Sequence, residues 1–177
     1  MAKSSKKQID QDEKRVIEQL QRNSNESIDK IAKTCGFSRQ KVWRIIKRLE
    51  NNKTIWGYTA VPDKEKQGVH HYIMLIKRSN QPAGEVIDNV VDGFKKYIGK
   101  NLGVFVQTAC ILQGEYDMLL CFTAKDITIA KRFIEFINKK YSSYIRDIML
   151  MEDIFSIRLS GMMNPKVDDI KEIFKTS

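Results

Sequence analysis

The sequence lacks any long hydrophobic run and any apolar leader. Although 42% of its 177 residues are hydrophobic, no apolar stretch approaches the roughly 20 residues that a membrane-spanning helix needs. The start of the chain, MAKSSKKQID, is polar and therefore differs from a signal peptide. These absences argue against a membrane protein, and we expect a cytoplasmic protein with no membrane partner.

Cysteine is also scarce. The three cysteines are Cys35, Cys110 and Cys121, an odd number without a Cys-x-x-Cys pair, which argues against a disulfide framework or a zinc finger. Because their sequence neighbours are apolar, we expect reduced, buried thiols. We also expect no metal site and no cofactor.

Acidic residues are few in the first third of the chain. Residues 1–61 contain fourteen Lys and Arg but only seven Asp and Glu, whereas the remainder contains seventeen and fifteen. Most of the formal charge of +9 therefore lies in a short N-terminal region, where a polyanion is expected to bind.

Two short helical patterns meet at a glycine within this basic region. Ser27 is suited to cap the first helix, and Ile28, Ile31 and Cys35 after it fall on one helical face. Gly36 follows, at a position where a helix end favours a left-handed residue, and Ser38 is suited to cap the next helix. The pattern predicts a helix-turn-helix with helices over residues 10–22, 28–34 and 39–51.

The last of these helices is strongly basic, and within it only Glu50 opposes the cations. Such a helix can lie in the major groove of DNA, where Lys and Arg neutralise phosphates and Arg and Gln read base edges. The alternative is an ordinary helical hairpin with a solvated charged face. For Trp43 alone, the alternative to a DNA contact is a rim residue packed on the neighbouring helix. The residues expected to contact DNA are Ser38, Arg39, Gln40, Lys41, Trp43, Arg44, Lys47 and Arg48.

A change of composition follows the basic helix. Residues 54–61 (TIWGYTAV) are rich in β-branched and aromatic side chains, which predicts a strand or wing. Residues 62–68 are polar with Pro62 and Gly68 at their ends, which is typical of a linker. We therefore predict a winged helix-turn-helix domain at 1–61, a linker at 62–68 and a second domain at 69–177.

The second domain alternates between strand and helix patterns. The predicted order is β-α-β-β-α-β, the ferredoxin-like arrangement, so the whole chain is assigned to the α+β class. A short closing helix is expected at 167–174. The predicted strands are residues 70–77, 104–112 and 116–123 and a final strand within 145–158, and the predicted helices are 83–97 and 127–140.

The strands of this domain contain apolar residues at consecutive positions, as in IMLI, ACIL and MLLCF. A strand with one wet face alternates instead. Since the two helices of a ferredoxin-like fold cover one face of the sheet, the second apolar face needs another cover. We predict that a second copy of the chain provides it, which gives a homodimer.

With these motifs in place, the chain resembles the Lrp/AsnC (feast/famine) family of transcription regulators. The matching segments are IDQDEKRVIEQLQ, IAKTCGFSRQKVWRIIKRLE and IWGYTAVPDKEKQG in the N-terminal part, and QGEYDMLLCF in the C-terminal part. The resemblance implies promoter binding by a dimer that often forms higher oligomers. It also implies a small effector, commonly an amino acid, bound near a Gly-x-Tyr-Asp hairpin.

Carried over by motif, the effector-binding residues are Gly114, Tyr116 and Asp117. A carboxylate can hold an α-ammonium group, and a glycine allows a ligand to approach the backbone. The alternative is that Gly114 only makes the turn and Asp117 caps a neighbouring amide. Two features depart from the family pattern: Leu150 and Met151 stand in the last strand, where many members have Ser or Thr, and the segment 95–102 is longer than usual.

The sequence thus predicts a sequence-specific, double-stranded DNA-binding regulator without catalytic residues. One alternative is an architectural protein that wraps DNA with little sequence preference. A second is an enzyme similar to the sirohaem decarboxylases, which share the two-domain plan, with His70 and His71 acting on a tetrapyrrole. No arginine-rich segment is present in the second domain to hold the carboxylates of such a substrate.

Overall fold

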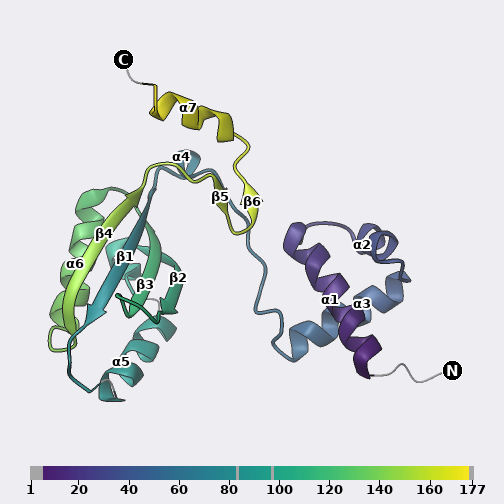
Figure 1. Ribbon diagram of the computed structural model, residues 1–177, viewed down its shortest axis with the longest axis horizontal. Coiled ribbons are helices and arrows are strands. Elements are labelled where there is room, and N and C mark those ends of the chain that lie inside the picture. Colours follow the sequence, from purple (N-terminus) through teal and green to yellow (C-terminus); the bar gives the residue numbers. More distant parts are fainter. Residues whose placement is uncertain (1–5, 83, 97, 176–177) are drawn as a thin grey trace. The chain divides into compact units, whose positions relative to one another are not determined.

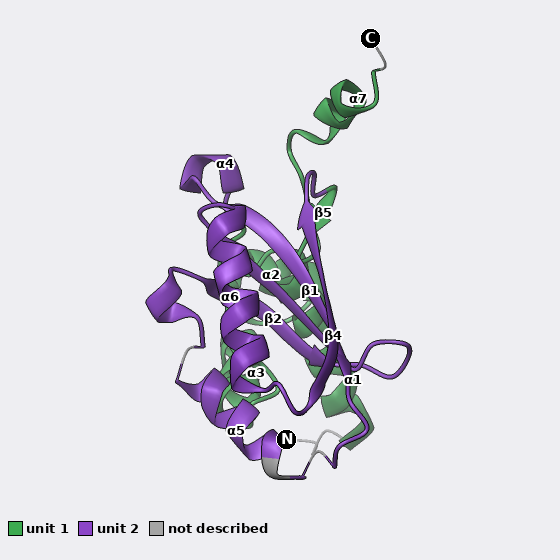
Figure 2. Cartoon of the chain, turned by 90° about the vertical axis from the view of Figure 1, so that its left-hand side faces the viewer, with its two compact units in different colours: residues 1–61, 157–177 green, residues 62–156 purple. Residues whose placement is uncertain are grey.

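The computed structural model describes residues 6–82, 84–96 and 98–175 (Figure 1). The chain divides into two compact units (Figure 2). One contains the residues up to Val61 together with those from Ile157 onward, and the other contains Pro62–Ser156. The domain division made from the sequence, in which residues 69–177 form one domain, stays a prediction.

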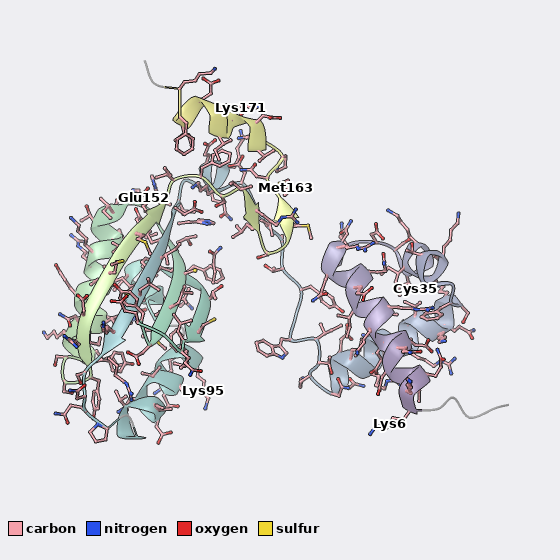
Figure 3. All side chains as sticks on the ribbon, in the orientation of Figure 1. Lys6, Cys35, Lys95, Glu152, Met163 and Lys171 are labelled. Carbon is pink, nitrogen blue, oxygen red and sulfur yellow. The ribbon has the colours of Figure 1, made fainter. Side chains whose placement is uncertain are left out.

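Three helices form the N-terminal part of the first unit: α1 (Lys6–Arg22), α2 (Ile28–Cys35) and α3 (Arg39–Asn51). Their apolar faces meet in a small core, and each fully buried aliphatic side chain there contributes roughly 1.5–3 kcal/mol. Cys35, labelled in Figure 3, belongs to this core. The buried residues are Val16, Ile31, Ala32, Cys35, Val42, Ile45 and Leu49.

The helix ends have the caps that the sequence predicts. Ser27 Oγ accepts a hydrogen bond from Lys30 N at 3.3 Å, and Ser38 Oγ accepts one from Lys41 N at 3.2 Å. Gly36 ends α2 with φ +68°, in the left-handed region that glycine adopts cheaply. The helix-turn-helix prediction is confirmed, with α1 starting four residues earlier than the pattern indicated.

The strand predicted for residues 54–61 is wrong. No residue of this segment pairs with a strand in the part of the chain that the structure describes. Ile55 packs against the three-helix core, whereas Trp56 is 96% exposed. Strand composition is not sufficient by itself, since a strand also needs a neighbouring backbone to accept and donate its hydrogen bonds.

The linker contains a short helix of its own. Helix α4 (Lys64–Gln67) is capped at its start by Asp63, whose carboxylate accepts from Glu65 N, and at its end by Gly68. Lys64 Nζ donates to Asp153 O at 2.6 Å. The second half of the linker is therefore fixed to the C-terminal end of a strand of the second unit.

A four-stranded antiparallel sheet forms the centre of the second unit, in the order β2-β3-β1-β4. Helices α5 and α6 pack on one of its faces (Figure 2). The predicted ferredoxin-like fold is confirmed. The elements are β1 (His70–Arg78), α5 (Gly84–Lys95), the 3-10 helix η1 (Lys100–Leu102), β2 (Phe105–Ile111), β3 (Met118–Ala124), α6 (Ile127–Lys140) and β4 (Ile145–Asp153).

The two faces of this sheet differ in burial. On the face covered by α5 and α6, side chains such as Tyr72, Met74 and Phe122 are buried against Phe133. On the other face the register places Leu75 opposite Leu119 and Met149, and Ile73 opposite Cys121 and Met151. We call this second surface the open sheet face, consisting of Ile73, Leu75, Leu119, Cys121, Met149 and Met151.

The chain continues beyond the sheet. Strand β4 ends at Asp153, within the range 145–158 in which the last strand is predicted. A small hairpin of β5 (Arg158–Leu159) and β6 (Met162–Met163) follows, and then η2 (Val167–Asp169) and α7 (Ile170–Ile173), which confirm the predicted closing helix. Within the described residues, no helix has the length and apolar character required to cross a membrane.

Candidate nucleic-acid interface

Helix α3 presents two contrasting faces. Val42, Ile45 and Leu49 point into the core, and Trp43 and Arg44 are exposed between them. Ser38 lies at the helix start, where its hydroxyl is occupied as the cap. The outward surface, which we call the α3 face, consists of six exposed residues: Arg39, Gln40, Trp43, Arg44, Lys47 and Arg48.

Four cations of α3 form ion pairs within the unit. The sequence indicated Glu50 alone as an opposing charge, but acids of α1 and α2 also reach the helix. These contacts join residues far apart in the chain, so no local pattern reveals them. The pairs are Lys41–Asp12 at 2.7 Å, Arg48–Glu13 at 2.6 Å, Arg39–Asp29 at 2.9 Å and Lys47–Glu50 at 2.8 Å.

Arg44 differs from these four cations. Its Nε donates to Gln40 O at 3.4 Å, and among the described residues no carboxylate oxygen lies within ion-pair distance of it. Trp43 beside it is 51% exposed. A guanidinium without a carboxylate partner is available to a phosphate or to the acceptor edge of a guanine.

A small polar network lies at the end of α3. Glu50 accepts from Lys47 Nζ at 2.8 Å and from the hydroxyl of Tyr58 at 3.1 Å. The hydrogen bond from Lys47 holds the pKa of Glu50 below its usual value, whereas burial raises the pKa of Tyr58. Tyr58 thereby ties the irregular segment after α3 back to the helix.

The predicted effector residues lie together at the β2–β3 hairpin. The Asp117 carboxylate accepts from Arg78 N at 2.7 Å, so it caps a neighbouring amide. The Tyr116 hydroxyl lies 3.8 Å from Met149 Sδ. Gly114 is exposed, and a Cβ atom there would meet nothing within 4 Å. The outer surface of the hairpin is therefore accessible to a ligand.

The second unit also contains a cavity of about 380 Å³ elsewhere. It lies between α5, η1 and α6, and its lining includes Asp92, Lys96, Lys100, Phe136 and Lys140. Part of its wall comes from the long segment 95–102. The hairpin residues do not contribute to this cavity. The cavity and the family motif therefore indicate two different positions for a ligand-binding site.

The two histidines contact carboxylates at the sheet end. His70 Nδ1 lies 2.7 Å from Glu152 Oε1, and His71 Nδ1 lies 4.0 Å from Asp153 Oδ2. Burial, together with the nearby Lys64 ammonium, lowers the pKa of His71, although Asp153 opposes that shift. His71 is consequently a buried, neutral group at pH 7.

The cysteines have three different environments, and none forms a disulfide. Cys35 is buried, and burial raises the pKa of its thiol. Cys121 is half-buried, whereas Cys110 is exposed on the edge strand β2. The expectation of a buried thiol is therefore wrong for Cys110. In the described part of the chain, no three His, Cys, Asp or Glu residues are grouped as metal ligands.

Known proteins share the N-terminal motif and most of the fold. A family model described as winged helix-turn-helix DNA-binding matches residues 10–55. An HTH-type transcriptional regulator of Pyrococcus furiosus is 28% identical over 112 residues, which cover 63% of this chain and 71% of that protein.

Two solved structures extend the similarity over most of the chain. The AsnC family transcriptional regulator from Agrobacterium tumefaciens superposes with a TM-score of 0.66 at 19% identity, covering 88% of this chain and 96% of the other. The feast or famine regulatory protein from M. tuberculosis, complexed with L-methionine, gives 0.67 at 16% identity, covering 89% and 99%. The chain is a helix-turn-helix transcriptional regulator with the Lrp/AsnC fold. The resemblance seen in the sequence is confirmed. In this regulator the matched residues 10–55 include all of α2 and α3.

Proposed function

We propose that the regulator reads DNA sequence with the α3 face, inserted into the major groove of a duplex. The observation that carries this proposal is the exposed Arg44 beside Gln40 on a helix whose opposite side is fixed in the core. Arg and Gln can each make bidentate contacts to base edges. Their position near the start of α3 is the part of a recognition helix that contacts bases.

The remaining residues of the α3 face serve a different role in this proposal. Arg39, Lys47 and Arg48 exchange their carboxylate partners for phosphates, because all three cations are exposed and ion pairs that solvent reaches contribute little. Ser38 fixes the helix start and its backbone faces the duplex. Trp43 packs on the sugar-phosphate backbone beside the groove. Affinity then falls steeply with salt as counterions are released.

Replacing Arg44 by alanine tests this proposal. If Arg44 reads a base, Arg44→Ala weakens binding to a selected site by about 1–3 kcal/mol, and binding to scrambled DNA changes much less. Fluorescence anisotropy with both duplexes measures the two affinities. Arg132→Ala, which removes an exposed arginine of α6, is the matched control. Equal affinities of Arg44→Ala and the wild type for both duplexes would overturn the base-reading role, and equal affinity of the wild type for both would favour the architectural alternative.

We further propose that two copies associate through the open sheet face. Ile73 and Leu75 lie at the centre of the sheet and are only partly buried, and Met149 and Met151 beside them are exposed. Burying this apolar surface in a partner removes it from water. A two-fold dimer also presents two recognition helices to two half-sites. Higher oligomers remain part of this proposal.

A small effector, such as an amino acid, is proposed to bind at the Gly114–Asp117 hairpin. The M. tuberculosis structure of the same fold is a complex with L-methionine, which supports an amino-acid ligand. One Asp117 oxygen accepts from Arg78 N, and the other lies 3.7 Å from Arg78 Nε, so an ammonium group would take the place of the guanidinium at that second oxygen. Titration calorimetry with the twenty amino acids tests this, with Tyr116→Ala as the variant expected to abolish any heat of binding.

We infer a regulatory role without catalysis, in the cytoplasm where the DNA is found. His70 and His71 are the residues that an enzyme hypothesis would use. His71 is buried beside Lys64 and Asp153, and His70 contacts Glu152, which supports structural roles for both. Unchanged absorbance of the protein after incubation with sirohaem is the expected result.

A further inference from the structure

Lys41 has an environment unlike that of the other cations of α3. Its ammonium lies 2.7 Å from Asp12 Oδ2 and 3.9 Å from the centre of the Phe37 ring. Asp12 is only 5% exposed, and its other oxygen accepts from Gln8 Nε2 at 3.0 Å. Both carboxylate oxygens of Asp12 are therefore engaged, one of them by Lys41.

This burial separates Lys41 from its neighbours on the helix. In the Arg39–Asp29 pair both side chains are exposed, and in the Lys47–Glu50 and Arg48–Glu13 pairs the acid is partly buried, whereas of these acids only Asp12 is fully buried. The pairs that solvent reaches exchange with phosphates easily. The Lys41 side chain is 39% exposed, but moving it to a phosphate would leave Asp12 as a buried carboxylate without its ion-pair partner, and an unpaired buried charge is unfavourable.

We propose that Lys41 is not a phosphate ligand and that Asp12 and Lys41 together form a positioning pair, which fixes the first turn of α3 on α1. The pair sets the direction in which the side chains of Gln40 and Arg44, on either side of Lys41, project from the helix. This inference rests on the proposed function and deepens it. It moves Lys41 from the residues expected to touch DNA to those that orient them.

A second consequence concerns specificity. In each subunit, the ion pair with Asp12 keeps the Lys41 ammonium from contacting a phosphate of the duplex. Neutralising Asp12 releases the Lys41 ammonium, which then gains a phosphate contact. Binding to any DNA becomes tighter and more dependent on salt, and the ratio of affinities for selected and scrambled duplexes falls.

The slope of log Kd against log salt concentration, measured for the full-length protein on a selected duplex, tests the pair. Each phosphate contact contributes about 0.9 to this slope. Asp12→Asn is expected to steepen the slope by about 0.9 per bound subunit. Glu50→Gln is the matched control: it neutralises an acid of a pair that solvent reaches, so its slope is expected to equal that of the wild type.

Two further variants keep the test decisive. The wild-type slope is expected for Lys41→Met and for the double variant D12N/K41M. The double variant removes both charges and leaves no buried ion. A slope reduced by about 0.9 per subunit in the double variant, or an equal steepening by D12N and E50Q, overturns the positioning pair. If the wild type itself binds no DNA at low salt, the proposed function fails instead, so the two failures are distinguishable.

Discussion

At the scale of single residues, the backbone conformation of Gly36 restricts which side chains this position accepts. Its φ of +68° lies in the left-handed region, where a residue with a Cβ atom costs roughly 1–2 kcal/mol. Because a Cβ atom there would meet nothing within 4 Å, strain alone sets the cost. We expect Gly36→Ala to lower the free energy of unfolding by that amount, measured by urea denaturation.

Gly57 provides the control for this substitution. A Cβ atom at Gly57 would also meet nothing within 4 Å, but the backbone there is not left-handed. Gly57→Ala is therefore expected to change stability by less than about 0.5 kcal/mol. A similar loss of stability in both variants would contradict the role of backbone strain at Gly36.

His71 gives the second unit a pH dependence of its own. Burial lowers its pKa below 6.5 in the folded chain, so the unfolded chain binds more protons as the pH falls below 6.5. By linkage, stability is full above that pH and is lost as the pH falls from 6.5 toward the folded-state pKa. Urea unfolding between pH 7.5 and 5 measures the loss.

His71→Gln is expected to remove this dependence, because glutamine does not titrate. His70→Gln is the control, since His70 is exposed and its replacement leaves the buried group in place. A wild-type stability that rises as the pH falls from 6.5 to 5 would contradict the expected direction.

At the scale of elements, the stability of α3 depends on Ser38, the residue that caps its N-terminus. Ser38 Oγ accepts from Lys41 N, and removing such a cap costs about 0.5–2 kcal/mol. We expect Ser38→Ala to destabilise the three-helix core by that amount and to weaken DNA binding. Circular dichroism during urea denaturation measures the first effect, with Ser24→Ala in the exposed turn as the control expected to change neither.

The elements also show which contacts a sequence can predict. The caps of α2 and α3 and the amphipathic faces depend on residues within a few positions of each other, so Ser27, Gly36 and Ser38 were predictable. The Asp12–Lys41 pair joins two helices across 29 positions and has no periodic signal. The segment 54–61 has strand composition without a partner strand, and therefore the prediction of a strand failed there.

The candidate site was predicted less completely than the fold. The basic residues of α3 were evident in the sequence, but the difference between Arg44 and Lys41 was not. Lys41 is paired with a buried acid of α1, whereas Arg44 has no carboxylate partner among the described residues. Likewise, the Gly-x-Tyr-Asp motif predicted the position of the hairpin, while the use of Asp117 as a cap for Arg78 N depends on how β1 and β3 pair.

At the scale of the whole molecule, the open sheet face determines the proposed assembly. Leu75 lies at its centre, so Leu75→Glu would bury a charge in a dimer but leave it exposed in a monomer. We expect this variant to sediment as a monomer while its sheet remains folded. Its affinity for a two-half-site duplex should fall toward that for a single half-site.

Ile127→Glu is the matched control, because Ile127 is an exposed apolar residue on α6, away from the open sheet face. This variant is expected to sediment as the wild type does. Analytical ultracentrifugation at several concentrations measures both variants. A Leu75→Glu protein that remains dimeric would place the interface on a different surface.

The length of the segment between α3 and α4 limits the distance that can separate the three-helix core from α4. Residues 56–63 belong to no helix or strand, while Lys64 attaches the following turn to the end of β4. Eight residues stretch to roughly 28 Å at most. In a dimer of this regulator, linkers of this length would allow binding to operators whose half-site spacing differs slightly. They would prevent binding to half-sites on opposite sides of the duplex.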